Sequence, residues 1–428
     1  MMMNKLTVYL CKIQRRQQKW PWLRSCYFGL RKTAPLLLIG ILLQCLALSF
    51  FQPHGFFNVI YHLEDQKWLS EANMIVHSLS CIVFSMTLLL LCVAVAWYRG
   101  HLFAKRESIP SMVTALFLLF LINFRVRRVP ADGTGQIILS GRIPFIEVLV
   151  IGLISAYFYH WIKNYLRLKS IWSLATATVF LGVVLKGARH LLNLGLFSNF
   201  SGTAFAEISS LLGDDQHQVV TIIMREIGRN LFIWCGFISP DQVLIAHTDS
   251  DLSRANLSAA LIKDNLEGLP HPLNIYSLSD SFAVLGGYGQ LLALILLFLL
   301  FSSRRRWRRR AWRNLVPVFL NINSGFLAEI PVFFNVVLLI PFVFVPVISI
   351  LLGAFAIDFG LIPPSVYQVP LNTPTFLNAF MGTNGHWSAL IFTIIILLIS
   401  MALYYPFFKA LDTPTAYLEQ KRGTKNEK

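Results

Sequence analysis

A polar stretch in the last third of the chain carries the residues best suited to bind a ligand. Asn321 and Asn323 form an Asn-x-Asn pair, and the carboxylate of Glu329 lies at the start of a long apolar run. Amides both donate and accept hydrogen bonds, whereas an ionised carboxylate only accepts them. A carboxylate in so apolar a setting is a candidate for a functional role. The stretch therefore predicts a substrate site.

The apolar run beside these residues contains three prolines, Pro331, Pro341 and Pro346. Proline interrupts the hydrogen bonds of a helix. In lipid, a broken segment is tolerated only where its free backbone groups face protein or a wet cavity. We therefore expect residues 321–412 to contain a broken membrane segment, with the substrate site at membrane depth.

Simpler interpretations stay open for the same residues. Asn321 and Asn323 can serve as caps of a hairpin, and Glu329 can lie at the membrane surface. His386 and Trp387 follow a glycine at the start of an apolar segment, a position typical of an aromatic anchor at the membrane interface.

The composition of the chain indicates a membrane protein with many helical spans. Of its 428 residues, 55% are hydrophobic and only 14% are charged, and the mean hydropathy is +0.60. Several apolar windows of about 17 to 25 residues are long enough to cross a bilayer core. These values predict an all-α polytopic membrane protein and exclude a soluble protein of average composition.

The formal net charge of +16 reflects basic residues that lie in short gaps between apolar segments. The clearest gap is Arg304–Arg313 (RRRWRRRAWR), with seven arginines. Because basic residues flank membrane spans on the cytoplasmic side, this run marks a cytoplasmic end beside anionic lipid headgroups. The basic N-terminal region and tail predict that both termini are cytoplasmic. We expect no binding of nucleic acid.

The cysteines and histidines show no spacing that predicts a metal site. The six cysteines lie singly, mostly in or beside apolar runs, and no Cys-x-x-Cys pair occurs. Such cysteines are typical of packing residues. We expect no metal and no cofactor, and no constellation of nucleophile and base marks a catalytic centre.

The apolar segments predict about ten membrane crossings. Residues 1–33 are expected to form a basic, interfacial N-terminal helix. Residues 34–410 form the expected transmembrane domain, and residues 411–428 form a cytoplasmic tail. The topology of segments 124–142 and 193–280 stays open.

A series of motifs runs through the C-terminal third. The motifs are Ser281–Gly287 (SFAVLGG), Asn321–Asn323 (NIN), Asn335–Phe342 (NVVLLIPF), Gly360–Pro364 (GLIPP), Val369–Pro370, Thr373–Pro374 and Tyr404–Lys409 (YYPFFK). In content and order they resemble the membrane IIC component, or permease, of bacterial sugar phosphotransferase systems of the lactose, cellobiose and chitobiose type. Pro35–Gly40 (PLLLIG) is similar to the first span of that family. Residues 284–410 match best and would include the second of two hairpins.

This resemblance implies a homodimer in the bacterial inner membrane, with about ten transmembrane helices and two re-entrant hairpins per chain. It implies that a disaccharide binds near the midplane and is phosphorylated by a separate IIB protein that works with a IIA protein. The candidate sugar-binding residues are Asn321, Asn323, Ser324, Glu329, Ser239, Gly286, Gly287 and Thr373. The chain shows no phosphoryl-carrying His or Cys motif of the IIA or IIB type.

Three positions depart from the family pattern. Ser324 stands where the family has the Glu of Asn-Ile-Asn-Glu-Pro, Ile238 where it has the His of Gly-Ile-His-Gly, and Leu371 where it has the Trp of Val-Pro-Trp. A serine hydroxyl cannot act as a base near neutral pH, and ring stacking needs an aromatic group. Two hypotheses follow: a sugar permease component, or a transport-inactive, IIC-like membrane sensor or regulatory anchor for a cytoplasmic partner.

Overall fold

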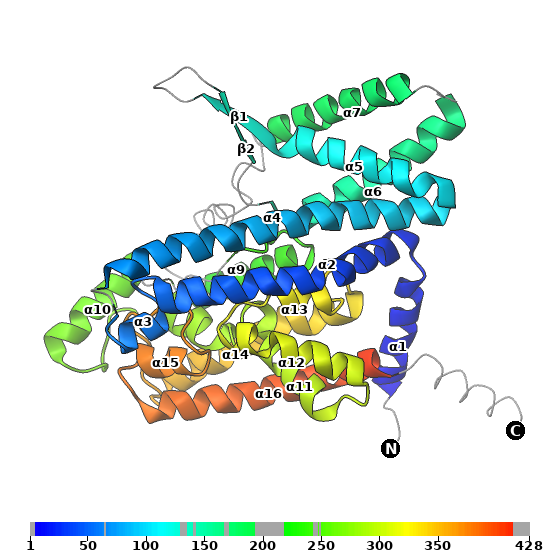
Figure 1. Ribbon diagram of the computed structural model, residues 1–428. Helices are drawn as coiled ribbons and strands as arrows, with labels where there is room; N and C mark the ends of the chain where they lie inside the picture. Colours follow the sequence, from blue (N-terminus) through cyan, green and yellow to red (C-terminus); the bar gives the residue numbers. More distant parts are fainter. Residues whose placement is uncertain are drawn as a thin grey trace, which may run out of the picture.

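The structure, a computed structural model, describes residues 5–63, 66–128, 135–139, 143–166, 171–192, 218–242, 247 and 250–413. Within these ranges the chain is helical apart from one short hairpin of strands (Figure 1). The elements are α1 (Lys5–Gln18), α2 (Pro21–Leu46), η1 (Ala47–Phe51), α3 (Phe56–Ile60), α4 (Lys67–Phe103), η2 (Lys105–Glu107), α5 (Ser108–Asn123), β1 (Phe124–Arg128), β2 (Gly135–Leu139), α6 (Phe145–Trp161), η3 (Ile162–Leu166), α7 (Ile171–Leu192), α9 (Gln218–Trp234), α10 (Asp251–Lys263), η5 (Tyr276–Ala283), η6 (Tyr288–Gln290), α11 (Leu291–Phe301), α12 (Arg305–Phe319), α13 (Ser324–Glu329), α14 (Val336–Asp358), α15 (Leu377–Gly382) and α16 (Trp387–Asp412). The fold class is the expected one.

Seven helical segments in the described ranges are long and apolar enough to cross a membrane. They are Pro21–Phe51, Trp68–Phe103, Lys105–Asn123, Phe145–Tyr165, Tyr276–Phe301, Val336–Asp358 and Trp387–Asp412. The chain is thus a multi-pass membrane protein. The apolar stretch Ser173–Ala188 of α7 and the 17-residue helix α9 are shorter than these seven segments. The expected count of ten crossings and the two re-entrant hairpins stay predictions.

The N-terminal region divides differently from the sequence-based boundary at residue 33. One amphipathic helix, α1, ends at Gln18, and α2 begins at Pro21 and continues without a break past residue 34. Proline at the first helical position is favourable because its missing N–H would have no partner there. Leu10 and Cys11 of α1 pack against Val337 and Ala410, which ties this helix to the ends of α14 and α16.

The prolines of the C-terminal half differ in their effect on the helices. Pro341 and Pro346 lie inside an unbroken α14, contrary to the expectation that they interrupt the segment. Neighbouring elements and local adjustment can compensate a proline in an apolar helix. The break lies instead between α13 and α14, where Pro331 precedes the cap residue Asn335. The Asn335 side chain accepts a 3.0 Å hydrogen bond from the N–H of Val337.

Strands β1 and β2 form an antiparallel pair with Phe124 opposite Leu139 and Arg128 opposite Gly135. This hairpin is the exception to the all-helical expectation. It places the three arginines of the segment after α5 on a strand rather than in an irregular loop. β-branched residues favour strands, and FRVRR contains a valine and GQIIL two isoleucines.

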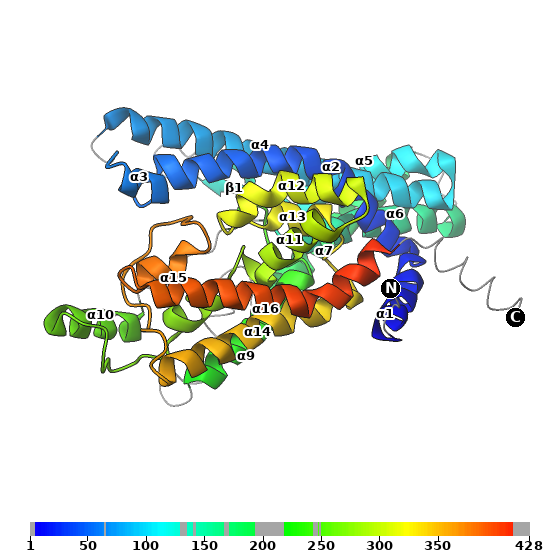
Figure 2. The ribbon, with the colours of Figure 1, turned by 90° about the horizontal axis from the view of Figure 1, so that it is seen from below.

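The long helices run between two distinct ends of the molecule. Helix α1 lies at one end, close to the last turns of α16, and α3, α10 and α15 lie at the other end in both views (Figures 1 and 2). The start of α12 belongs to the α1 end, because Ser302 donates a 2.6 Å hydrogen bond to Asp412 at the end of α16. The arginine-rich run and the N-terminal helix therefore share one end.

Candidate functional site

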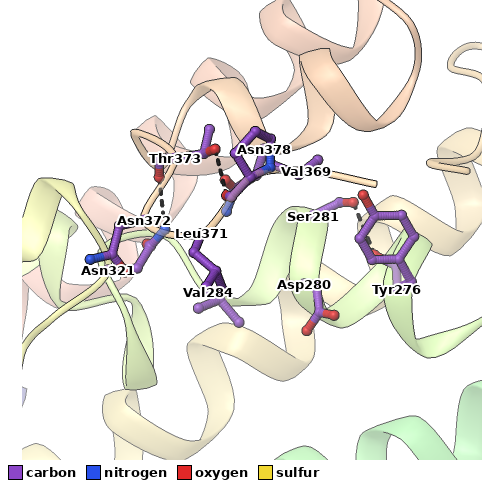
Figure 3. Close-up of a pocket in the computed structure, with 11 residues that line it drawn as sticks. Tyr276, Asp280, Ser281, Val284, Asn321, Val369, Leu371, Asn372, Thr373 and Asn378 are labelled. Carbon is purple, nitrogen blue, oxygen red and sulfur yellow. Dashed lines mark hydrogen bonds between the residues drawn. The ribbon is translucent and has the colours of Figure 1, made fainter. Parts of the chain in front are cut away.

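A polar pocket lies between η5 and the loop that precedes α15 (Figure 3). Its lining residues are Tyr276, Asp280, Ser281, Val284, Asn321, Val369, Pro370, Leu371, Asn372, Thr373 and Asn378. The lining combines one carboxylate, hydroxyls and side-chain amides with an aromatic ring and aliphatic groups. Figure 3 shows Tyr276, Asp280 and Ser281 along η5, across from the loop that carries Leu371, and the Asp280 carboxylate points away from that loop. This mixture of orienting polar groups and apolar surface is typical of a small-molecule site.

The turn after η5 requires glycine at two of the predicted site positions. Gly286 and Gly287 have φ angles of +77° and +83°, a region that side chains with a Cβ rarely adopt. A Cβ on Gly286 would lie 2.5 Å from the Cβ of Leu292, and one on Gly287 would lie 2.7 Å from the amide nitrogen of Asn323. The turn can therefore approach the Asn-x-Asn segment only without side chains.

Asn321 connects this turn to the wall of the pocket. Its amide oxygen accepts a 3.3 Å hydrogen bond from the N–H of Gly287, and its amide nitrogen donates at 3.2 Å to the carbonyl oxygen of Thr373. Asn323 donates to the carbonyl oxygen of Tyr288 at 2.8 Å. Gly286 donates to the hydroxyl of Thr375 at 2.9 Å. Three of the eight candidate residues, Gly287, Asn321 and Thr373, are therefore linked by hydrogen bonds, and of the eight only Asn321 and Thr373 line the pocket.

Leu371 lies in the pocket, at the position where the family resemblance implies tryptophan. Its N–H donates to the carbonyl oxygen of His54 at 2.8 Å, and its own carbonyl accepts from Phe56 at 2.9 Å. The loop is therefore fixed to the segment that enters α3. The backbone geometry keeps residue 371 at the pocket wall, where its side chain supplies an apolar surface but no ring.

Asp280 and Tyr276 are pocket residues that sequence reasoning missed. Asp280 was not distinguished because it ends a hydrophilic segment of unassigned topology, and Tyr276 lies among ordinary loop residues. The phenol of Tyr276 donates to the carbonyl of Tyr367. The signal that could have found Asp280 is its position directly before SFAVLGG, the first of the family-like motifs in the C-terminal third.

A buried group of charged and polar residues supports η5 from behind. Glu226 and Arg229 of α9 form a buried ion pair. The Glu226 carboxylate also accepts hydrogen bonds from the Asn230 amide at 2.8 Å and from the Ser279 hydroxyl at 3.0 Å. The Arg229 guanidinium lies 5.4 Å from the centre of the Tyr288 ring. Buried charges need partners, and Ser279, the residue that precedes Asp280, is one of the partners of Glu226. Its hydrogen bond to Glu226 holds Ser279 in place.

Ser324 and Ser239 lie together but outside the pocket lining. The Ser324 hydroxyl, at the start of α13, donates a 3.1 Å hydrogen bond to the carbonyl oxygen of Pro240. Ser239 and Ile238 are also buried, and the Ile238 carbonyl accepts from Phe145 at 3.0 Å. The positions at which the family resemblance implies Glu and His are thus both buried, and each hydrogen-bonds to a different partner within the protein.

Glu329 faces the arginine-rich helix rather than the pocket. Its carboxylate forms an ion pair with Arg313, lies 4.0 Å from Arg310, and accepts a 2.7 Å hydrogen bond from the amide of Asn314. Burial raises the pKa of the Glu329 carboxyl above its ordinary value, and the two arginines and the amide oppose that rise. Through these contacts Glu329 joins α13 to α12. Binding of a sugar by Glu329 stays a prediction.

Comparison with known proteins relates about a third of the chain to sugar transport components, although no family model matches it. It is 38% identical over 133 residues to the cellobiose-specific EIIC component of the phosphotransferase system (PTS) of Lactococcus lactis, covering 31% of this chain and 27% of that protein. It is 29% identical over 145 residues to the oligo-beta-mannoside-specific EIIC component of Bacillus subtilis, covering 34% and 33%. It is 29% identical over 143 residues to the lactose-specific EIICB component of Staphylococcus haemolyticus, covering 33% and 24%.

The matched segments span about a quarter to a third of the length of these relatives. Among solved structures, ChbC, the IIC component from the N,N'-diacetylchitobiose-specific phosphotransferase system, aligns with 97% of this chain and 99% of its own, at 20% identity and a TM-score of 0.42. The sequence matches fall on proteins of one kind. Over about a third of its length, this chain is similar in sequence to the membrane EIIC components of sugar phosphotransferase systems of the cellobiose and lactose type.

Proposed function

We propose that this chain is the permease component of a sugar phosphotransferase system in the bacterial inner membrane. It binds a disaccharide-like sugar and carries it across the membrane for phosphorylation by a separate IIB protein. Its partners in this proposal are the sugar, soluble IIB and IIA proteins, membrane lipid and a second copy of the chain. The relatives named above are EIIC and EIICB components for cellobiose, oligo-beta-mannosides and lactose, which makes a β-linked disaccharide the first substrate to test.

The observation that carries the proposal is the lining of the pocket. A sugar presents hydroxyl groups around its rim and C–H groups on its faces. Asp280, Asn321, Asn372 and Asn378 offer acceptors and donors for the rim. Leu371, with the other apolar side chains of the lining, offers surface for a face of the ring. A site that served only a hydrophobic molecule or an ion would not need both kinds of lining.

The pocket must widen to admit a disaccharide. Its volume is about 50 Å³, which is room for only a few water molecules. The loop that carries Val369 to Thr373 forms one wall and η5 forms the other, so separation of this loop from η5 is the simplest way to enlarge the space. Transport proteins alternate between states with different access to a site, and a narrow pocket between two separable walls suits that behaviour.

The proposal is tested by uptake into proteoliposomes that contain the purified chain. Vesicles are loaded with a phosphorylated IIB protein encoded beside this chain or taken from a cellobiose system, and radiolabelled cellobiose is added outside. We expect accumulation of sugar phosphate inside, dependent on phosphorylated IIB. Vesicles with the unphosphorylated IIB protein are the matched control.

Uptake also separates the two hypotheses drawn from the sequence. A permease component accumulates phosphorylated sugar, whereas a transport-inactive sensor or anchor binds its partner or sugar without accumulation. If cellobiose, lactose and N,N'-diacetylchitobiose all fail to accumulate with every IIB protein tested, the transport proposal is wrong.

A further inference from the structure

We propose that Asp280, held by His247, is the carboxylate that binds a hydroxyl of the sugar in this chain. The inference rests on the proposed function and deepens it, because it assigns the binding residue and the chemical class of the ligand. The family resemblance implies a carboxylate at position 324, and this sequence has serine there. The structure offers a carboxylate at another place, on the wall of the polar pocket.

The geometry of Asp280 is that of a positioned ligand rather than of a surface charge. Its side chain is only 8% exposed and lines the pocket. The backbone N–H of His247 donates to Oδ2 at 2.6 Å, and the Nδ1 atom of the His247 ring lies 3.1 and 3.0 Å from the two carboxylate oxygens. A carboxylate accepts about four hydrogen bonds, so Asp280 keeps acceptor capacity for a ligand.

The support behind Asp280 fixes its direction. Ser279, the preceding residue, donates to the buried carboxylate of Glu226, and the Arg229 guanidinium donates to the Ser279 hydroxyl at 3.3 Å. On the other side Ser281 donates to the hydroxyl of Ser365 at 2.7 Å. Both sequence neighbours are thus held, and a residue fixed in this way can present its carboxylate with little loss of entropy on binding.

A second group in the pocket points independently to a ligand. Asn372 is 6% exposed and lines the same pocket, and its amide nitrogen has no hydrogen-bond partner within the described part of the chain. Native proteins rarely leave a buried donor without a partner. In this proposal one sugar hydroxyl accepts from Asn372 and another donates to Asp280, because a hydroxyl does both.

The charge of the pocket selects among polar ligands. Of the described residues that line it, none is Lys or Arg, and Asp280 carries the negative charge. His247 faces Asp280 from outside the lining, and Arg229 is already paired with Glu226. A phosphorylated sugar or a sugar acid would meet an unfavourable charge here. The ligand class is therefore a neutral, polyhydroxylated sugar.

Ser324 does not supply the equivalent interaction in this structure. Its hydroxyl is buried and already donates to the carbonyl of Pro240. It is not among the residues that line the pocket. In this proposal the carboxylate that binds the sugar is therefore at position 280, whereas the family resemblance implies one at position 324.

The test compares sugar binding by the purified full chain and by Asp280→Asn. Titration calorimetry with cellobiose, lactose and N,N'-diacetylchitobiose identifies a neutral ligand, and a 6-phosphate of that sugar serves as the charged probe. Hydrogen bonds to a charged group are stronger than neutral ones. We expect Asp280→Asn to bind the neutral sugar about 10- to 100-fold more weakly and to discriminate less against the 6-phosphate than the wild-type chain does.

Two further variants keep the test decisive. Asp251→Asn is the matched control, because the side chain of Asp251 is 97% exposed on α10, where it forms an ion pair with its helix neighbour Arg254. It should bind like wild type. Asn372→Gly keeps a residue suited to the φ of +55° at that position and removes the amide. We expect it to weaken binding with little change in thermal stability, because no protein hydrogen bond of that nitrogen is lost.

The outcomes separate this inference from the proposed function. If the wild-type chain binds none of the sugars, the proposed function is wrong. If the wild-type chain binds a sugar, and Asp280→Asn is folded with unchanged affinity and unchanged discrimination, the assignment of Asp280 is overturned. If Asp280→Asn does not fold, unchanged affinity in Asn372→Gly overturns the assignment of this pocket.

Discussion

Single residues in this chain have roles that depend on what surrounds them. Asn321 lines the pocket and hydrogen-bonds to the N–H of Gly287 and to the carbonyl oxygen of Thr373, and its binding of a sugar stays a prediction. Glu329 looked equally promising in the sequence, but its partners are Arg313 and Asn314, which belong to a helix earlier in the chain. Sequence spacing could not show which carboxylate faces the pocket. Asp280 required the folded arrangement.

The ion pair of Glu329 gives a prediction for pH. The residue lies outside the seven apolar segments, and burial raises the pKa of its carboxyl above the ordinary value of 4.5. A raised pKa means that the folded state favours the protonated form, so this contribution to stability is present at low pH and is lost as the pH rises through the folded-state pKa. Glu329→Gln lacks that contribution.

We therefore expect the melting temperature of the wild-type chain, relative to Glu329→Gln, to fall as the pH is raised from about 4.5 towards neutrality. Thermal unfolding of both proteins in the same detergent over this range measures the difference. A difference that instead grows with pH would show that the arginines of α12 outweigh burial at this site.

At the scale of elements, the site depends on a turn that only glycine can form. The motif made Gly286 and Gly287 candidate sugar-binding residues, a role that stays a prediction. Their positive φ angles and the close approach of Asn323 to Gly287 explain why glycine is needed at both positions. The position of the helix break was less predictable. Pro341 and Pro346 lie inside an uninterrupted run of helical residues, and the chain breaks instead around Pro331, because packing of neighbours decides where a proline is tolerated.

Gly287→Ala tests this turn. The left-handed conformation costs a residue with a Cβ about 1–2 kcal/mol, and the new Cβ would also displace the Asn323 amide that it meets at 2.7 Å. We expect a lower melting temperature and weaker sugar binding.

Two glycines provide controls for Gly287→Ala. Gly360 has a φ of +67°, but a methyl group added there would meet no atom within 4 Å, so Gly360→Ala reports backbone strain alone. Gly187 has neither feature, so Gly187→Ala in α7 should be neutral or stabilising by up to about 1 kcal/mol. Equal effects of Gly287→Ala and Gly360→Ala would contradict the close approach.

For the whole molecule, composition and charge predicted a multi-pass membrane protein, because each apolar window and each basic gap along the chain adds to the same conclusion. Apolar windows identify spans by length, and the arginines of residues 304–313 mark one end of α12. The expected ten crossings stay a prediction, because seven described segments are long and apolar enough to span a membrane, while α9 and the apolar stretch of α7 are shorter. Neither length nor hydropathy shows how such helices pack against their neighbours.

The two ends of the molecule give a topology prediction. If the arginine-rich run is cytoplasmic, α12 begins inside the cell and α10 lies outside, because they occupy opposite ends (Figure 2). Ile262 of α10 is 85% exposed, and Arg309 of α12 is also exposed. We expect Ile262→Cys to react with a membrane-impermeant maleimide in intact cells and Arg309→Cys to react only after permeabilisation. The wild-type chain controls for the native cysteines, and labelling of both positions from one side would contradict this topology.

The proposed transport requires a neutral disaccharide to enter the pocket between η5 and the loop of Leu371. Titration of the purified, folded chain with cellobiose, lactose and N,N'-diacetylchitobiose tests this most directly. We predict saturable binding of at least one of these sugars by the wild-type chain, weakened in Asp280→Asn and unchanged in Asp251→Asn. Failure of all three sugars to bind a folded, monodisperse protein would contradict this prediction.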